Sequence, residues 1–200
     1  MAELKTGIRW GAWLAIAGGV VFVLCLGLLH WLAPEFLPRQ HSISQYTYSD
    51  YAYLLAMAFV ALGIGMAAAA YSLVVEAPSE TGSRAGVFLL LIASFGFFFM
   101  AVFSADPGDA AETIQGKMHA FSYALAAVTA MLGGLLVSLR LRNSGGFFEW
   151  MALILNLAGW GSYLLPRFAP LTGNLVGRVT LGAMALWLVL VGGLIQMKDH

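Results

Sequence analysis

Residues 173–197 read G-N-L-V-G-R-V-T-L-G-A-M-A-L-W-L-V-L-V-G-G-L-I-Q-M, and Arg178 is the one charged side chain in this stretch. A helix of about 20 apolar residues crosses the hydrocarbon layer of a bilayer, which is about 30 Å thick. The stretch is therefore long enough to span a membrane as a helix. This feature decides the class of the fold.

Similar apolar blocks fill the rest of the chain of 200 residues, which is 60% hydrophobic and 10% charged. Soluble domains carry about 25% charged residues. Alternating strands of about ten residues, which are typical of membrane barrels, are absent from the sequence. We expect an all-α fold: one domain over residues 1–200, a six-transmembrane-helix bundle with short loops and no soluble domain. The predicted spans lie near 11–33, 50–75, 85–104, 117–139, 147–166 and 173–197.

The positive residues predict how this bundle lies in the membrane, because cytoplasmic loops are enriched in lysine and arginine. Six spans place both termini on one side. That side holds Lys5, Arg9, Arg84, Arg140, Arg142 and Lys198, whereas the other holds Arg39, Lys117, Arg167 and Arg178. We therefore expect a cell-membrane protein with both termini in the cytoplasm.

Charge and cysteine content exclude some classes of function. The net charge is zero and no basic run occurs, so nucleic acid is not an expected partner. Cys25 is the only cysteine, which excludes an intrachain disulfide. No cofactor is expected, and the sequence leaves the oligomeric state open.

Arg178 is the most informative single residue, because a charged side chain inside a span costs about 2.5 kcal/mol or more at a helix centre. Such a residue usually pairs with an anion or lines a polar cavity. Candidate anions lie in the acidic loop A-D-P-G-D-A-A-E-T-I-Q-G-K-M-H at 105–119, which we expect on the same side of the membrane. Asp106 in this loop is also a natural turn former, since it stands in Asp-Pro-Gly.

Polar residues recur at helical spacing at the start of the fourth span. Asp109 and Glu112 have the form of a capping box, which predicts a helix that begins before the apolar run. One face of that helix carries Glu112, Gln115, His119, Ser122 and Tyr123. Such a face is costly against lipid, so we expect it to point at other helices.

The fifth and sixth spans carry polar faces too, with Asn156, Trp160, Tyr163 and Arg167 on one and Asn174 and Arg178 on the other. These residues gather in the predicted outer half of the membrane. The sequence therefore predicts an outer-leaflet pocket that binds a lipid headgroup or another small polar or anionic molecule. Its predicted lining residues are Asp106, Glu112, Gln115, His119, Tyr123, Tyr163, Arg167 and Arg178.

The segment from Phe103 to His119 resembles a family of small prokaryotic six-span membrane proteins known as domain of unknown function 998 (DUF998). The shared pattern is an aromatic–x–x–Asp segment followed by Gly-x-x-His, here Phe103, Asp106, Gly116 and His119. The resemblance covers nearly the whole chain and implies that Asp106 and His119 belong to one unit, but it implies no activity. Some relatives have a histidine directly before the glycine, where this chain has Gln115.

Two other hypotheses remain open. His30, His119 and Asp106 are the alternative ligands of a metal-dependent membrane hydrolase, although no paired histidine spacing such as H-E-x-x-H occurs. A non-catalytic structural protein is the other, because buried ion pairs also fix how helices pack. A fixed positive charge in the outer leaflet favours binding over catalysis.

Overall fold

A computed structural model describes residues 2–76, 83–107, 112–165, 168 and 173–197, and these residues form helices without any strand. The all-helical class is confirmed. The α-helices are α1 (Ala2–Leu32), α2 (Ala52–Glu76), α3 (Arg84–Val102), α4 (Ile114–Leu141), α5 (Phe147–Leu164) and α6 (Gly173–Met197). Two short 3₁₀ helices, η1 (Ile43–Tyr48) and η2 (Arg142–Ser144), lie in the connections.

Five of these helices are long and apolar enough to cross a membrane. They are α1, over Trp10–Leu32, together with α2, α3, α4 and α6. These candidate spans establish the membrane character of the chain. The helix α5 is also long enough, with 18 residues, but it is less apolar, since it carries Glu149 in its first turn and Asn156 further along. Position 166 of its predicted span, 147–166, lies outside the described residues. A sixth span therefore stays a prediction.

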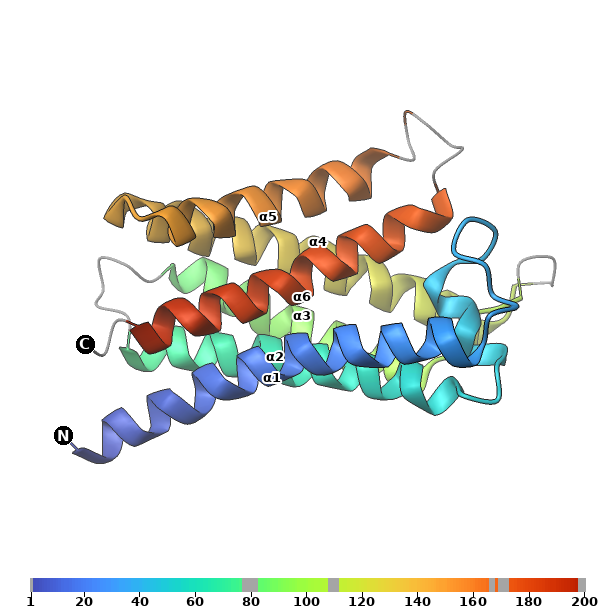
Figure 1. Ribbon diagram of the computed structural model, residues 1–200, viewed down its shortest axis with the longest axis horizontal. Helices are drawn as coiled ribbons and strands as arrows, with labels where there is room; N and C mark the ends of the chain where they lie inside the picture. Colours follow the sequence, from blue (N-terminus) through green and yellow to red (C-terminus); the bar gives the residue numbers. More distant parts are fainter. Residues whose placement is uncertain (1, 77–82, 108–111, 166–167, 169–172, 198–200) are drawn as a thin grey trace.

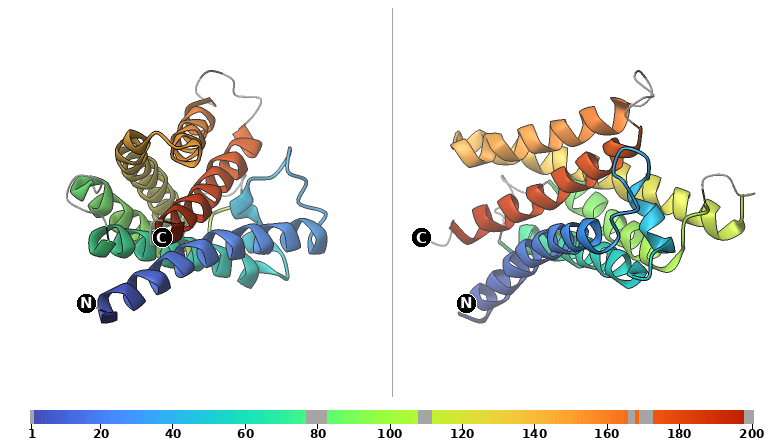
Figure 2. Two further views of the ribbon diagram at one scale, coloured as in Figure 1. Left: turned by 60° about the vertical axis from the view of Figure 1, so that its left-hand side comes forward. Right: turned by 45° about the vertical axis from the view of Figure 1, so that its right-hand side comes forward.

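The helices form a ring, because each packs against the next along the chain and α1 also packs against α6 (Figures 1 and 2). Both α2 and α4 also contact α6. Of the five candidate spans, α2 is the most buried. Beyond these helices and their connections, the described part of the chain contains no soluble domain.

Two consecutive glycines let α1 approach both of its neighbours. A Cβ atom on Gly18 would lie 2.5 Å from the carbonyl oxygen of Ala61 in α2, and one on Gly19 would lie 2.4 Å from that of Ala185 in α6. No real Cβ atom tolerates such distances, so these positions require glycine. Small residues at helix interfaces allow this close packing in membranes.

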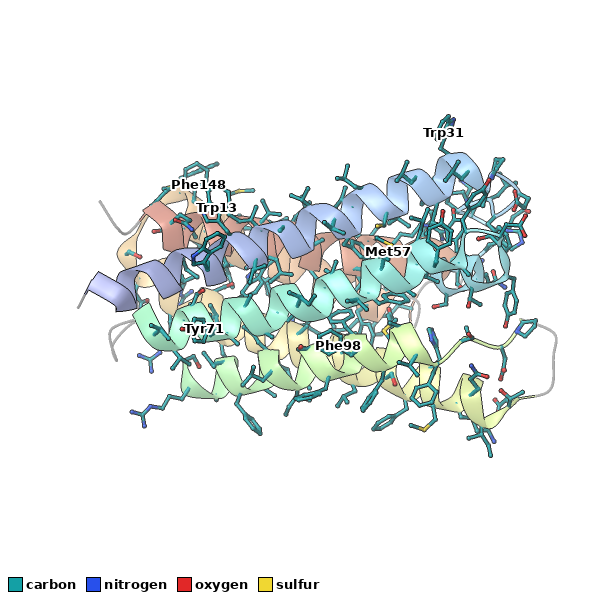
Figure 3. All side chains as sticks on the ribbon, turned by 90° about the horizontal axis from the view of Figure 1, so that it is seen from below. Trp13, Trp31, Met57, Tyr71, Phe98 and Phe148 are labelled. Atoms are coloured by element: carbon teal, nitrogen blue, oxygen red, sulfur yellow. The ribbon has the colours of Figure 1, made fainter. Side chains whose placement is uncertain are left out.

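The outer surface of the bundle is apolar and aromatic, as lipid contact requires. Trp10 and Trp31 are 70% and 76% exposed, and they stand near the two ends of the α1 span. Figure 3 shows Trp31 pointing away from the bundle. Exposed tryptophans at both ends of a span are typical of the two membrane interfaces.

The two ends of the bundle differ. The first residues of α1 and the last of α6 lie at one end (Figure 1). The opposite end carries the connection between α1 and α2, residues 33–51, which we call the cap segment. It also carries the start of α4 and the start of α6. The candidate functional residues lie at this second end.

Candidate functional site beneath the cap segment

The cap segment folds onto the bundle through its own aromatic residues. Tyr46 of η1 is completely buried, and its hydroxyl donates a hydrogen bond to the carbonyl oxygen of Phe36 at 3.3 Å. The Phe36 and Tyr46 rings are 5.4 Å apart. At the start of η1, the Gln45 side chain accepts a hydrogen bond from the backbone N–H of Ser42 at 2.9 Å. These contacts give the segment a defined shape.

Arg178, one turn inside α6, binds the backbone of this segment. Its Nη1 atom donates to the carbonyl oxygens of His41 at 2.6 Å, Asn174 at 3.0 Å and Pro38 at 3.2 Å. Its guanidinium carbon also lies 5.7 Å from the centre of the Tyr46 ring, within the range of a cation–π contact. The cation is therefore solvated by backbone oxygens and by one aromatic face.

The charge of Arg178 is not neutralised by a carboxylate of any described residue. The residue is only 9% exposed, and its Nη2 atom is buried without a hydrogen-bond partner among the described residues. The ring nitrogen Nδ1 of His41, whose carbonyl oxygen Arg178 binds, is also buried without a partner. Buried donors are rarely left unpaired, because each costs about 1–3 kcal/mol.

His30, in the last turn of α1, completes the contacts of the guanidinium group. The Nε2 atom of its ring lies 3.3 Å from Nε of Arg178, and its Nδ1 atom lies 2.6 Å from the carbonyl oxygen of Leu26. Arginine can only donate and a carbonyl can only accept. The ring is therefore a neutral imidazole that carries its proton on Nδ1.

Asn174 adds a second clamp from the first turn of α6. Its side-chain Nδ2 atom donates to the carbonyl oxygens of Gln40 at 2.9 Å and Arg39 at 3.2 Å. Together with Arg178, this residue binds the carbonyls of four residues in the cap segment, Pro38, Arg39, Gln40 and His41. The start of α6 thus recognises the backbone of the cap segment.

His119 anchors the other half of the cap segment. The ring is 6% exposed, with Nδ1 at 2.7 Å from the carbonyl oxygen of Phe103 and Nε2 at 2.9 Å from the hydroxyl oxygen of Ser44 in η1. This histidine joins α4 to the end of α3 and to the cap segment. A cavity of about 30 Å³ beside the ring has roughly the size of one water molecule.

Asp106 is turned toward the start of α4 rather than toward Arg178. Its carboxylate accepts hydrogen bonds from the Thr113 hydroxyl at 2.6 Å and the Thr113 backbone N–H at 2.8 Å. The Thr113 hydroxyl in turn accepts from the backbone N–H of Gly116 at 3.0 Å and caps α4. The two bonds from Thr113, helped by the charge of Lys117, lower the pKa of Asp106.

Tyr48 of η1 ties the Asp106 loop back to the cap segment. Its hydroxyl donates to the carbonyl oxygen of Ala105, the residue that precedes Asp106. Partial burial and then the charge of Asp106 raise the pKa of the Tyr48 phenol. The loop between α3 and α4 therefore packs against η1 through Tyr48 as well as through His119.

The predicted start of α4 needs a correction. The helix does begin before residue 117, at Ile114, but its N-cap is Thr113 and not the predicted pair of Asp109 and Glu112. Glu112 lies outside the helix, and Asp109 lies outside the described residues. The predicted capping box was wrong because Thr113, fixed by Asp106, satisfies the first backbone donors of the helix.

The predicted pocket residues are not brought together as one lining. Glu112 is exposed and pairs with Lys117 at 3.5 Å, and Gln115 is also exposed. The rings of Tyr123 and Tyr163 face each other with centroids 6.2 Å apart. Arg167 lies outside the described residues. Arg178 and His119 contact different parts of the cap segment, so the segment itself connects them.

The alternative metal ligands are also separate. Both ring nitrogens of His30 and of His119 are engaged in hydrogen bonds, and Asp106 is engaged by Thr113. The described residues contain no group of three or more His, Cys, Asp or Glu side chains that would hold a metal ion. This geometry does not support the predicted metal site.

Sequence reasoning did not identify the residues of the cap segment that bind Arg178 and His119. Ser44 carried no signal, because a serine in a polar loop is ordinary. The carbonyl groups of Pro38 and His41 have no signal in a sequence at all. The unusual length of the connection, with its tyrosines at 46, 48 and 51 and a fourth at 53 in the first turn of α2, was the one available indication.

These features define a class: a helical membrane protein in which one end of the bundle is closed by an ordered cap segment held from α4 and α6. The chain belongs to the family described as protein of unknown function (DUF998), whose match covers residues 16–194. The earlier resemblance is thereby confirmed. Searches of curated proteins and of solved structures gave no match.

Proposed function

We propose that this chain is a six-span protein of a prokaryotic cell membrane with both termini in the cytoplasm. The helix α5 then serves as the remaining span, and its described part of 18 residues falls within the usual range of about 17–25. In that orientation the cap segment faces the outside. The cap end is therefore the part of the molecule that extracellular molecules and outer-leaflet lipids meet.

We further propose that Arg178 binds an anionic group, either the headgroup of a membrane lipid or a small carboxylate or phosphate compound. The observation that carries this proposal is the buried Nη2 atom of Arg178, for which no described residue provides a hydrogen-bond partner. A carboxylate or phosphate oxygen accepts strongly from a guanidinium group. Such an oxygen would satisfy the free donor and neutralise a cation that no described carboxylate neutralises.

The position of Arg178 near the start of α6 also favours an anion beside its guanidinium group. The residue lies in the second turn of α6, which begins at Gly173. The N-terminus of a helix carries a partial positive charge and attracts anions. Because the Nη2 atom lies buried beneath the cap segment, the ligand would reach it when residues 36–42 withdraw.

A second function has its own observation in favour of it. Arg178 and Asn174 bind the backbone of the cap segment at four residues, so their role is also explained if they only fasten the segment to α6. In this structural role the charge needs no ligand. Catalysis has less support: Ser44 and His119 lie 2.9 Å apart, as a nucleophile and its base would, but the ring is buried and is oriented by the carbonyl oxygen of Phe103 rather than by a carboxylate.

Native mass spectrometry of the protein in detergent distinguishes the two functions. Delipidated wild-type protein is mixed with phosphatidylglycerol, with phosphatidylcholine or with inorganic phosphate. We expect one retained phosphatidylglycerol if the source is a lipid and one retained phosphate if the source is soluble. The variant Arg178→Gln is expected to lose the bound anion in either case.

Arg39→Gln is the matched control, because Arg39 is an exposed arginine of the same cap segment whose described contact is made by its backbone oxygen. This variant should retain the anion. If the wild type retains phosphatidylglycerol no better than phosphatidylcholine and also retains no phosphate, the anion-binding proposal is wrong and the structural role remains.

A further inference from the structure

The contact between His30 and Arg178 depends on the protonation state of the histidine. The guanidinium Nε–H of Arg178 donates to Nε2 of His30, so Nε2 must carry a free electron pair. The other ring nitrogen, Nδ1, donates its proton to the carbonyl oxygen of Leu26 one turn earlier in α1. Both atoms have fixed roles in the closed arrangement.

A proton added to His30 converts this attraction into repulsion. Two N–H donors would then point at each other over 3.3 Å, and two positive charges would lie side by side, with Arg178 9% exposed and His30 half-buried. The ring does not escape by turning, because either ring orientation of an imidazolium presents a donor to Arg178. The bond from Nδ1 to Leu26 remains favourable, so the arginine side chain is the group that moves.

The surroundings do not compensate the added charge. The Tyr46 ring lies near both groups, with its centroid 5.6 Å from that of His30 and 5.7 Å from the guanidinium carbon of Arg178. His41, Asn174 and Pro38 present carbonyl oxygens to the same arginine. The titratable groups around the pair are thus Tyr46 and His41, and no carboxylate of a described residue contacts either cation.

Release of Arg178 frees only part of the cap segment. Its bonds to the carbonyls of Pro38 and His41 would be lost, which leaves the bonds of Asn174 to the carbonyls of Arg39 and Gln40 as the remaining described side-chain hydrogen bonds of α6 with residues 36–42. The bond between Ser44 and His119 is made by η1 itself and does not involve Arg178. A serine hydroxyl both donates and accepts, so the Ser44 contact tolerates a proton on His119 by reversing its direction. Acidification therefore breaks the contact between His30 and Arg178 but not the contact between Ser44 and His119.

We propose that His30 and Arg178 form an acid-sensitive latch, in which protonation of His30 expels the arginine, breaks its bonds to Pro38 and His41, and so lets residues 36–42 of the cap segment separate from α6 more readily, with only the Asn174 contacts to oppose it. Histidine is suited to this role because it changes charge near neutral pH. The inference concerns only the latch and does not depend on whether Arg178 binds an anion.

The test measures how easily a buried position under the cap segment is reached at two pH values. Ile43 directly follows the released residues and is 4% exposed, so Ile43→Cys reports the loss of cover when residues 36–42 withdraw. Leu37 is already 49% exposed in the closed arrangement and gains little on release, so Leu37→Cys serves as the exposed reference. Both are made in a Cys25→Ala background, because Cys25 is the only native thiol. The ratio of their labelling rates with a methanethiosulfonate reagent removes the effect of pH on the thiol itself.

We expect the ratio of the Ile43→Cys rate to the Leu37→Cys rate to rise about tenfold between about pH 7.5 and about pH 5.5, the range in which histidine titrates. His30→Gln, whose amide oxygen accepts from Arg178 without titrating, should abolish the rise. His41→Gln should leave it in place. The latch is refuted by an unchanged ratio in folded protein, by a rise that persists in His30→Gln, or by a rise that His41→Gln removes.

Hydrogen–deuterium exchange provides a readout that needs no cysteine substitution. The backbone N–H groups of Gln40 and His41 both donate to the carbonyl oxygen of Leu37 at 2.9 Å. Corrected for the intrinsic effect of pH, their exchange should accelerate on acidification in the wild type and not in His30→Gln. Equal protection at both pH values in the wild type would also refute the latch.

Discussion

A Cβ atom on Gly116 would overlap the carboxylate of Asp106, so the first turn of α4 and the beginning of the α3–α4 loop meet at a contact that only glycine permits. The carboxylate is not free to move aside, because the backbone N–H and the hydroxyl of Thr113 both bind it. The Asp–Gly pair of the family pattern therefore has a steric explanation. His119 lies one turn further along the same helix.

The variant Gly116→Ala should weaken the start of α4. The added methyl group displaces Asp106, whose carboxylate holds the N-cap residue Thr113 in place, and complete loss of an N-cap costs about 0.5–2 kcal/mol, which is the upper bound of the effect. We expect a lower midpoint of thermal unfolding in detergent. Gly182→Ala in α6 is the matched control, because a Cβ atom there meets nothing within 4 Å. Equal midpoints for both variants would contradict the steric explanation.

Asp106 should also make stability depend on pH at the acidic end. Its pKa is lowered in the folded protein, first by the Thr113 hydroxyl and then by the Thr113 backbone N–H. A carboxyl group of this kind stabilises the fold fully above its unfolded pKa of about 3.9, and that contribution is lost as the pH falls through the lower folded pKa.

The measurement compares the unfolding midpoints of the wild type and Asp106→Asn over a range of pH. Their difference should stay constant from about pH 7 to about pH 5 and shrink below about pH 4, where the wild-type carboxyl is protonated. Other carboxylates cancel in this difference. A difference that stays constant into the acidic range would show that the charge of Asp106 does not stabilise the helix start.

The bond between Ser44 and His119 should appear as an energetic coupling between two distant parts of the sequence. Ser44→Ala leaves the Nε2 atom of His119 without a donor, which should cost about 0.5–1.5 kcal/mol. In a His119→Phe background the same substitution should cost nothing more. Unfolding of the two single variants and the double variant gives the coupling.

A control cycle uses Ser144→Ala, which lies in η2. Its only described side-chain bond is to the carbonyl oxygen of Leu141, so its effect should simply add to that of His119→Phe. Additive behaviour of Ser44→Ala and His119→Phe would instead mean that His119 does not hold the cap segment.

The helices could be predicted well from the sequence, because each apolar block is long and continuous. For example, the block predicted at 85–104 corresponds to Arg84–Val102, and that at 173–197 coincides with α6. Hydropathy reports the environment of whole segments and is therefore a strong signal. It does not establish that α5, the shortest of the α-helices, crosses the membrane.

The partners of Arg178 could not be predicted, for a physical reason. Reasoning from charge looks for carboxylates, and the acidic loop at 105–119 offered several. The structure instead gives Arg178 backbone oxygens of the cap segment, and every residue type has such an oxygen. His119 was singled out correctly as a buried polar residue, but its partner Ser44 lies 75 positions away.

A polar contact in the middle of the bundle allows a prediction that is independent of the cap end. The side-chain Nδ2 atom of Asn156 donates to the carbonyl oxygen of Met131 at 3.1 Å, and its Oδ1 atom is buried without a partner. A Cβ atom on Gly134 would lie 2.5 Å from the same Nδ2 atom. Gly134 therefore makes room for an amide that joins α5 to α4.

Gly134→Ala should push Asn156 off Met131 and lower stability by about 1–3 kcal/mol, since a bond is lost and the core is overpacked. Adding Asn156→Ala removes the group that clashes, so the double variant should be more stable than the sum of the single effects predicts. Unfolding in detergent measures all three variants. If the effects simply add, the spacing of α4 and α5 does not depend on this amide.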